Sequence, residues 1–202
     1  MIVWINGAFG AGKTHTAHEL QRRLPGSHVA DPELLGFALR KTLPASDGDF
    51  QDLPLWRIMV RDSLIEGSRR TTGPVFVPMT LLRNDYFEEI VGGLRSAGVD
   101  VRHYALLTSR AELERRLKLR SGYVLGRILG RDETWGLQQL DRCLAALTRD
   151  EFGVHVDNTS RSLDEVVEWI AADLELTLQR PRLSPLRHQT RRIAVAARHI
   201  RL

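Results

Sequence analysis

The sequence predicts a three-layer α/β fold in which a five-stranded parallel sheet lies between helices. Five short apolar runs alternate with longer segments in which apolar residues recur every three or four positions, a pattern typical of such sheets. A phosphate-binding sequence motif follows the first run. The predicted strands are residues 2–6, 27–30, 74–79, 101–107 and 153–157. The predicted helices lie near residues 13–24, 32–43, 54–70, 84–97, 109–119, 132–149 and 162–178.

The first predicted strand leads into a glycine-rich sequence, GAFGAGKT, at residues 7–14. It fits the P-loop pattern G-x-x-x-x-G-K-[ST], with a strand before it and a helix after it. Glycines let backbone N–H groups approach phosphate oxygens, and the start of the helix adds partial positive charge. The alternative is a glycine-rich turn without a ligand. Lys13 is expected to contact the β- and γ-phosphates in catalysis, and the Thr14 hydroxyl to bind Mg²⁺ directly. The residues predicted to bind nucleotide are Gly7, Ala8, Phe9, Gly10, Ala11, Gly12, Lys13, Thr14, Thr16 and Asn158.

The sequences around the lysines favour ATP over GTP as the nucleotide. Proteins that select guanine usually carry the motif N/T-K-x-D, but the lysines outside the P-loop, at positions 41 and 118, lie in RKTL and LKLR. Asn158 follows the last predicted strand, at the edge of the sheet where the P-loop lies, and we expect it beside the adenine. A plain strand-to-helix turn is the alternative there.

Asp31 ends the second strand and has two interpretations. The sequence Asp31-Pro32-Glu33 is a favourable helix start, with an N-cap followed by proline and an acid. At the same edge of the sheet, the carboxylate could also accept the proton of an attacking hydroxyl. The third strand, VFVPMT, lacks the acid that P-loop proteins usually place beside Mg²⁺. Thr80, or a water molecule held by Asp31, is expected to replace it.

The acceptor substrate is expected to bind after the second helix. Phe50 and Trp56 could stack on a uracil-like base, and Arg57 or Arg61 could bind a diphosphate or sugar oxygen. The alternative for Trp56 is a buried stripe, because apolar residues follow it at helical spacing. On the helix near 132–149, Trp135 and Arg142 share a face that could line the acceptor pocket, and an exposed polar face is the alternative.

Residues 120–133, RSGYVLGRILGRDE, contain three glycines and three arginines. We expect a short lid, because glycines allow a loop to move and guanidinium groups stabilise charge on a transferring phosphoryl group. A solvated loop is the alternative. The arginines with a predicted catalytic role are Arg120, Arg127 and Arg131.

The positive charge is concentrated at the C-terminus. The chain has a net charge of +4, but residues 180–202 hold seven arginines and no acid, which leaves 22 basic and 25 acidic residues elsewhere. We therefore expect a domain at 1–179 and a basic tail at 180–202. Residues 186–202 form an amphipathic pattern that could bind an anionic membrane surface, and the alternative is docking onto the domain. The tail lacks the aromatic residues that favour nucleic-acid binding.

Other features indicate a cytoplasmic location, with the tail as a peripheral contact to the inner face of the membrane. The single cysteine, Cys143, excludes an internal disulfide and shares a helical stripe with leucines, so it is expected to pack in the core. The N-terminus lacks a basic segment before its apolar run, and no run of 18 apolar residues occurs.

Several motifs together resemble the tunicamycin-resistance protein family, within the nucleoside-monophosphate-kinase-like P-loop proteins. They are INGAFGAGKT, DPE followed by L and G, DFQDLPLWR, VPMTL, QQLDRC and the terminal HIRL. The resemblance implies binding of ATP and Mg²⁺, phosphotransfer to a small molecule, and resistance to a nucleoside antibiotic that blocks lipid-linked sugar transfer.

We therefore expect a kinase that moves the γ-phosphoryl group of ATP to a hydroxyl of tunicamycin or a similar nucleoside antibiotic. Two alternatives remain: a protein that sequesters the drug without chemistry, and a nucleic-acid kinase or binding protein. The third strand favours a small-molecule kinase over a motor, because motor-type ATPases depend on the acid that VFVPMT lacks.

Overall fold

The computed structural model describes the chain except for residues 45–47, 120–134, 185–189 and 191–202. The side chain of Trp135 is also outside the description. The predicted lid, with Arg120, Arg127 and Arg131, therefore lies outside the described residues. So does the predicted amphipathic segment 186–202, apart from Thr190.

Five parallel strands form one sheet, which confirms the predicted fold class. The strand order is β2-β3-β1-β4-β5, and each predicted strand is found within one residue at either end. The central strand β1 is buried along its whole length, because helices cover both faces of the sheet. The strands are β1 (Ile2–Gly7), β2 (His28–Val29), β3 (Val75–Pro78), β4 (Val101–Leu107) and β5 (Val154–Asp157).

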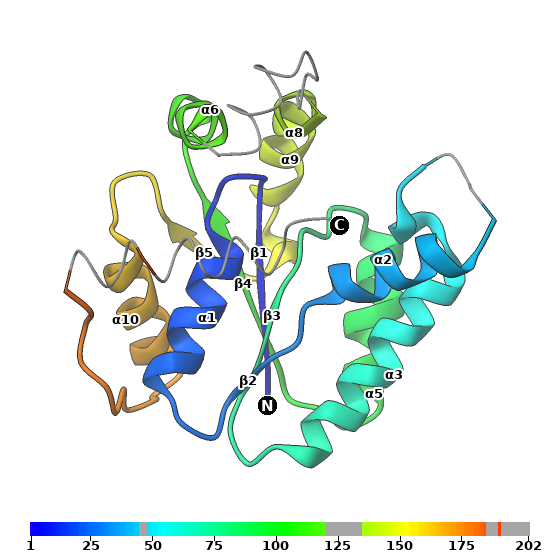
Figure 1. Ribbon diagram of the computed structural model, residues 1–202, viewed down its shortest axis with the longest axis horizontal. Helices are drawn as coiled ribbons and strands as arrows, with labels where there is room; N and C mark the ends of the chain where they lie inside the picture. Colours follow the sequence, from blue (N-terminus) through cyan, green and yellow to red (C-terminus); the bar gives the residue numbers. More distant parts are fainter. Residues whose placement is uncertain (45–47, 120–134, 185–189, 191–202) are drawn as a thin grey trace.

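The helices form two outer layers and a group beyond the strand ends (Figure 1). One face of the sheet carries α1 and α10, and the other carries α2, α3 and α5. Helices α6, α8 and α9 lie toward the carboxyl ends of the strands. The α-helices are α1 (Lys13–Arg23), α2 (Pro32–Thr42), α3 (Pro54–Arg70), α4 (Asn84–Phe87), α5 (Gly93–Ser96), α6 (Arg110–Lys118), α8 (Trp135–Gln138), α9 (Leu140–Leu147) and α10 (Leu163–Asp173). Short 3₁₀ turns are η1 (Phe50–Asp52) and η3 (Asp150–Phe152), and η2 (Glu88–Gly92) is π-helical.

Two predicted helices differ from the observed ones. The predicted helix 132–149 is interrupted at Gln139, and the predicted helix 162–178 ends at Asp173. The early end has a clear cause. Glu175 has φ 54°, and the N–H groups of Glu175 and Leu176 donate to the carbonyls of Ala172 and Ala171 at 3.0 and 2.8 Å. This is a Schellman motif, which usually carries glycine at the left-handed position. With glutamate there, the sequence shows no stop signal.

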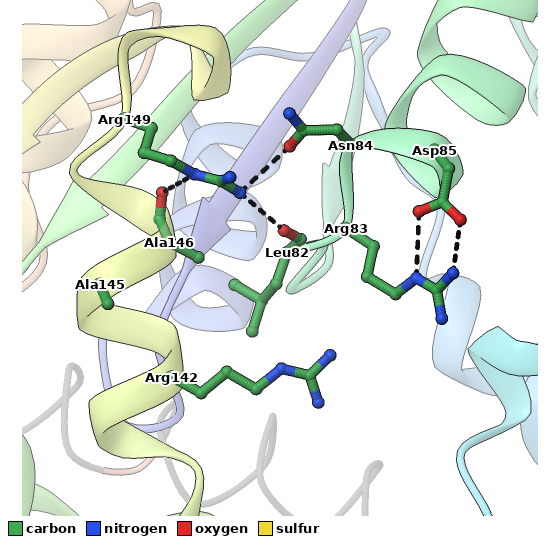
Figure 2. A pocket seen from close by; sticks show the side chains of 8 residues that line it. All are labelled: Leu82, Arg83, Asn84, Asp85, Arg142, Ala145, Ala146 and Arg149. Carbon is green, nitrogen blue, oxygen red and sulfur yellow. Dashed lines mark hydrogen bonds and ion pairs between the residues drawn. The ribbon is translucent and has the colours of Figure 1, made fainter.

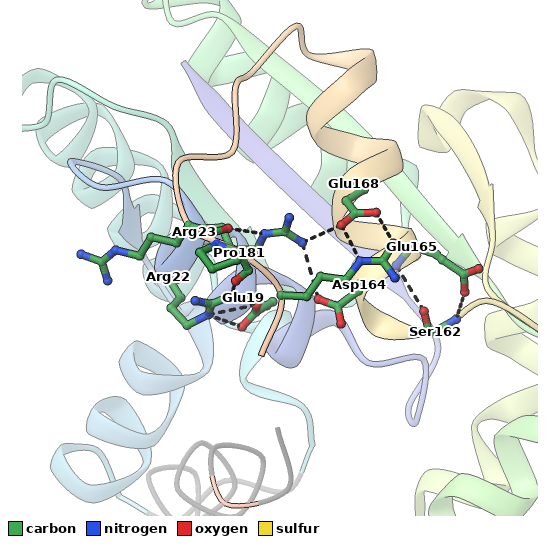
Figure 3. A network of polar contacts seen from close by, with 10 residues as sticks. Glu19, Arg22, Arg23, Ser162, Asp164, Glu165, Glu168 and Pro181 are labelled. Carbon is green, nitrogen blue, oxygen red and sulfur yellow. Dashed lines mark hydrogen bonds and ion pairs between the residues drawn. The ribbon is translucent and has the colours of Figure 1, made fainter. Parts of the chain in front are cut away.

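The start of the predicted tail is docked on the domain (Figure 3). The N–H of Gln179 donates to the Arg23 carbonyl at 2.9 Å, and Arg22 and Arg23 donate to the carbonyls of Pro181 and Arg180 at 2.6 and 3.1 Å. Thus α1 holds the backbone of residues 179–181. Residues 179–182 are therefore docked on the domain, whereas both alternatives for residues 186–202, membrane binding and docking, stay predictions.

The side chain of Arg182 strengthens this contact. Arg182 forms an ion pair with Glu168 of α10, and Glu168 also pairs with Arg23 at 2.9 Å. Hydrogen bonds from Arg182, and next from Arg23, lower the pKa of Glu168 to about 2. Among the described residues, no helix is long and apolar enough to cross a membrane.

Candidate active site

The glycine-rich loop joins the end of β1 to the start of α1 at the carboxyl edge of the sheet (Figure 1). Gly10 and Gly12 have φ of 89° and 91°, a conformation that residues with a Cβ atom rarely adopt. Gly12 is the N-cap of α1 and supplies no side-chain cap. The first N–H groups of α1 therefore have no partner from a capping side chain and are suited to bind an anion. We call residues 7–14 the cradle.

Lys13 lies across the cradle. Its Nζ donates to the carbonyls of Gly7 and Ala8 at 2.9 and 3.1 Å and lies 5.5 Å from the centre of the Phe9 ring. The ammonium group is thus held inside the loop, where the P-loop pattern places it against phosphate oxygens. Thr14 is the second residue of α1, so a hydroxyl oxygen lies at the same end of the helix.

The residues present fit Mg²⁺ bound together with a nucleotide. Magnesium in such sites usually keeps one or two protein oxygens, with phosphates and water as the other ligands. Thr14 could supply one oxygen, and a Cβ atom built at Gly12 would meet no atom within 4 Å, so the cradle has space. Within the described residues there is no cluster of three or more His, Cys, Asp and Glu that could hold a metal without phosphate.

Buried side chains hold the cradle from the β3 side. Asn6, with no exposed surface, accepts from the N–H groups of Gly7 and Leu81 at 2.9 and 3.1 Å and donates to the Leu81 carbonyl at 2.7 Å. Thr80 donates its hydroxyl proton to the Gly7 carbonyl at 2.8 Å. Sequence reasoning missed Asn6, although a polar residue at the end of an apolar strand, directly before the motif, was a usable signal.

Asn158 holds the cradle from the β5 side. Its side-chain Nδ2 donates to the Ala11 carbonyl at 2.6 Å, and Arg116 donates to the Asn158 carbonyl at 3.0 Å. The amide of Asn158 is thus engaged by the loop itself, and its contact with adenine stays a prediction. Thr16 is similar: it is buried, and its hydroxyl donates to the Gly12 carbonyl at 3.1 Å, so its direct contact with nucleotide also stays a prediction.

Asp31 caps α2, which confirms one of its two interpretations. Its Oδ1 accepts from the Glu33 N–H at 3.0 Å, and Pro32 is the first residue of the helix. A role as proton acceptor, or as the holder of a magnesium-bound water, stays a prediction. The hydroxyl proton of Thr80 is donated to the Gly7 carbonyl, so Thr80 supports the loop, and its role beside Mg²⁺ stays a prediction.

The predicted stacking residues are part of the core, which corrects the expectation that they bind a base. Trp56 has no exposed surface, and its Nε1 donates to the Pro32 carbonyl at 3.1 Å. Phe50 packs against it with ring centres 5.2 Å apart, and a Cβ atom at Gly36 would come within 2.5 Å of the Phe50 ring. Stacking fails because the buried stripe Trp56, Val60 and Leu64 faces inward from α3.

Arg57 is engaged by its own surroundings, which corrects its assignment to the acceptor, whereas the assignment of Arg61 stays a prediction. Arg57 pairs with Glu89, lies over the Tyr86 ring and donates to the Gln51 carbonyl at 2.6 Å. Arg61 pairs with Asp62 at 2.8 Å. Arg57 nevertheless acts on the site indirectly. The side chain of Gln51 donates to the Thr80 carbonyl at 3.1 Å, and Thr80 holds the cradle.

An open groove lies between the segment that follows β3 and helix α9 (Figure 2). It has a volume of about 600 Å³ and is lined by residues 82–85 on one side and by Arg142, Ala145, Ala146 and Arg149 on the other. Arg142, predicted to bind the acceptor, projects into this space. We call this space the arginine groove.

Both walls of the arginine groove are attached to the cradle. The wall at residues 82–85 directly follows Thr80 and Leu81, which bind Gly7 and Asn6. The other wall is α9, where Cys143 is buried. Burial raises the pKa of the Cys143 thiol, while the nearby Lys13 and a hydrogen bond from the Phe9 N–H act in the opposite direction. The hydrogen bond joins α9 to Phe9 of the cradle, and Cys143 packs in the core as expected.

The fold and the cradle together define a P-loop nucleotide-binding protein with a kinase-like fold. A family model described as AAA domain matches residues 2–149. The tunicamycin resistance protein of Deinococcus radiodurans is similar, with 37% identity over 89% of this chain and 98% of that chain and a TM-score of 0.75. The chain therefore belongs to the tunicamycin-resistance protein family, which confirms the resemblance seen in the motifs.

More distant structures share the fold alone. A gluconokinase from Sinorhizobium meliloti has 18% identity, a TM-score of 0.60, and coverage of 86% of this chain and 90% of that chain. The APS kinase of Mycobacterium tuberculosis, solved in complex with AMPPNP and APS, has 20% identity and a TM-score of 0.59, over 86% of this chain and 96% of that chain. A search among curated proteins gives no match.

Proposed function

We propose that this protein transfers the γ-phosphoryl group of ATP to a hydroxyl group of tunicamycin or of a similar nucleoside. The observation that carries the proposal is the arrangement at the strand ends. A phosphate cradle and an open groove share α9 as a wall and are joined by the contacts of Thr80 and Asn6. A donor held in the cradle and an acceptor held in the groove would be neighbours, which is the main requirement for phosphoryl transfer.

The chain supplies positioning and charge for this reaction. Lys13 and the N–H groups at the start of α1 would bind the β- and γ-phosphate oxygens, with Lys13 leaving the Gly7 and Ala8 carbonyls to do so. Mg²⁺, held through Thr14, would neutralise charge on the same oxygens. The acceptor oxygen would form a bond to phosphorus as the bond to the β-phosphate oxygen breaks.

Asp31 would take the proton that the acceptor hydroxyl loses. Its Oδ1 caps α2 through Glu33, and a carboxylate can bind more than one donor. A cap that is also a base would hold the carboxylate in a defined orientation. The proposal places the protein in the cytoplasm, where ATP is available.

The mass of the drug tests the proposal. The protein is incubated with MgATP and tunicamycin, and the drug is then analysed by mass spectrometry. A phosphate adduct, absent when AMPPNP replaces ATP, supports transfer. Tight binding with unchanged drug mass would instead support sequestration, the alternative function. Retardation of oligonucleotides would favour the nucleic-acid alternative.

Membrane contact by the tail needs a separate test. Flotation of the protein with phosphatidylglycerol liposomes is compared between the full chain and a truncation after Ser184. This truncation keeps the contacts of Arg182 with Glu168. Equal flotation of the two proteins would contradict membrane binding by residues 186–202.

A further inference from the structure

The three arginines of the arginine groove differ in how their charge is compensated. Arg83 pairs with Asp85, its Nε lying 3.0 Å from Oδ1. Arg149 pairs with Glu151 at 3.1 Å and donates to the Leu82 carbonyl and to Asn84 Oδ1, both at 3.1 Å. Within the described part of the chain, Arg142 makes no hydrogen bond or ion pair with any residue. Among the described residues, the groove therefore presents one guanidinium group, that of Arg142, whose donors have no protein acceptor.

The position of Arg142 relates this charge to the reaction. Arg142 directly precedes Cys143, which is buried and accepts a hydrogen bond from Phe9 of the cradle. Figure 2 shows the Arg142 side chain leaving α9 and extending between the two walls. An anion bound to Arg142 would thus be held in the groove, beside the loop that holds the phosphates of the donor.

The rest of the groove suits a small organic molecule. Ala145 and Ala146 of α9 and Leu82 on the opposite wall are apolar, and the alanines leave space. A volume of about 600 Å³ lies within the range of about 300–1,000 Å³ common for ligand pockets. An apolar wall with one available cation matches a ligand that has an uncharged body and an oxyanion.

We propose that the acceptor carries an oxyanion, a carboxylate or a phosphate group, and that Arg142 binds it. This inference rests on the proposed phosphotransfer and adds the substrate class. The planar guanidinium group offers paired N–H donors that fit two oxygens of one carboxylate or phosphate. Among the nucleosides that the proposed function includes, one that carries such a group in addition to its free hydroxyl would therefore bind more tightly than a neutral one.

The test compares ligands that differ only in the oxyanion. Protein saturated with Mg²⁺ and AMPPNP, so that the cradle is occupied, is titrated calorimetrically with uridine 5′-monophosphate and uridine. A second titration uses glucuronate and glucose, which distinguishes carboxylate from phosphate. At least one anion is expected to bind about 10-fold or more tightly than its neutral partner, since hydrogen bonds to charged groups are worth about 1.5–3 kcal/mol.

One variant and one control variant test whether Arg142 causes the preference for the anion. The substitution Arg142→Met keeps the length of the apolar stem and is expected to remove the preference while the affinity for MgAMPPNP stays unchanged. The control Arg69→Met alters an exposed arginine at the end of α3 and should leave the preference intact. Melting temperatures of both variants show that they fold.

The outcomes separate this inference from the proposed function. Equal binding of anion and neutral partner, no binding of either anion, or a preference that survives in Arg142→Met would each overturn it. Weaker MgAMPPNP binding by Arg142→Met would also overturn it, by assigning the arginine to the donor. An Arg142-dependent preference with no phosphorylated product in any mass measurement would support the anion site and contradict the proposed phosphotransfer. A phosphate adduct on tunicamycin with no anion preference would support phosphotransfer and contradict the anion site.

Discussion

The cradle and the arginine groove lie side by side but are built from different kinds of contact. Asn6, Thr80 and Asn158 are each at most 5% exposed, and each holds backbone groups of the cradle or of the adjoining loop with uncharged donors and acceptors. The groove is lined by exposed arginines: Arg83 and Arg149 pair with other side chains, and Arg142 pairs with none of the described residues. The two regions therefore differ in how strongly their geometry is determined before a ligand binds.

This difference has a physical basis in burial. A buried amide that loses its partner costs the protein its full desolvation energy, so the contacts of Asn6 favour a single arrangement of the loop. Exposed ion pairs contribute little because water and salt compete for both partners. Buried contacts that favour one arrangement suit a cradle that binds the same phosphates each time. Exposed ion pairs, which can be exchanged, suit a groove that adapts to different acceptors.

The largest effect is expected from Lys13→Ala. The substitution removes the charge held in the cradle, and phosphotransfer is expected to fall by about 10³-fold, as it does when a preorganised donor is lost. Loss of the contacts with Gly7 and Ala8 should lower the free energy of unfolding by only about 1 kcal/mol. Thermal stabilisation by MgATP, measured against Lys41→Ala on α2, is the readout. If the Lys13 variant were stabilised as strongly as the control, the cradle would not be the nucleotide site.

The second prediction compares one asparagine from each region. Asn6→Ala leaves three buried backbone groups without their partner, so the free energy of unfolding should fall by about 3 kcal/mol. Asn84→Ala removes an exposed amide from the groove, and the change should stay within about 0.5 kcal/mol. Urea unfolding measures both. Similar losses in the two variants would contradict the distinction between a cradle held by buried contacts and an adaptable groove.

The substitution Asp31→Asn separates the two roles of this residue, the cap of α2 and the proposed proton acceptor. Asparagine caps helices about as well as aspartate, so the melting temperature should stay near that of the parent protein. A neutral amide is a poor proton acceptor, and phosphotransfer should fall by at least about 10²-fold. Asp31→Ala provides the control for the cap, with an expected stability loss of about 1 kcal/mol. If the asparagine variant transferred phosphate as fast as the parent protein, Asp31 would be a helix cap and not the proton acceptor.

Acid should lower the free energy of unfolding through His103 in the core, without changing the charge of the arginines in the groove. His103 on β4 is 5% exposed and stacks on Phe87, and burial, followed by the charges of Arg95 and His155, lowers its pKa to about 3. The unfolded chain binds this proton near pH 6.5 and the folded protein only near pH 3. Stability from this group is therefore complete above pH 6.5 and is lost as the pH falls toward 3. Between pH 7 and pH 5 the loss is about 2 kcal/mol.

Urea unfolding at pH 7 and pH 5 measures this loss, with His103→Leu as the comparison. The variant should lose about 2 kcal/mol less than the parent protein over the same interval. Arginines stay charged throughout this range, and so does a sugar carboxylate such as glucuronate, so the affinity of the folded protein for that anion at Arg142 should change little. An equal pH dependence in parent and variant would assign the acid sensitivity to other groups.

Local patterns in the sequence determined much of the fold and the donor side of the site. Apolar runs and helical spacing located all five strands of the sheet, because backbone hydrogen bonding and burial act over a few residues. GAFGAGKT identified the cradle because its glycines are needed at the positive φ of Gly10 and Gly12. Asp31-Pro32-Glu33 predicted the cap of α2, since a cap is formed by residues two or three positions apart.

Tertiary structure alone decided which of the remaining polar and aromatic residues reach the site. Helical spacing shows that Trp56 shares a face with Val60 and Leu64, but it cannot distinguish a core face from a pocket wall. Asn6 contacts Leu81, 75 residues away, only because β3 lies beside β1 in the sheet. Arg142 and Arg57 are the same residue type but differ in their surroundings: Glu89 and Gln51 engage Arg57, whereas Arg142 projects from α9 without an ion pair to any described residue. Such partners come from distant segments, so they are set by strand order and helix packing rather than by neighbouring residues.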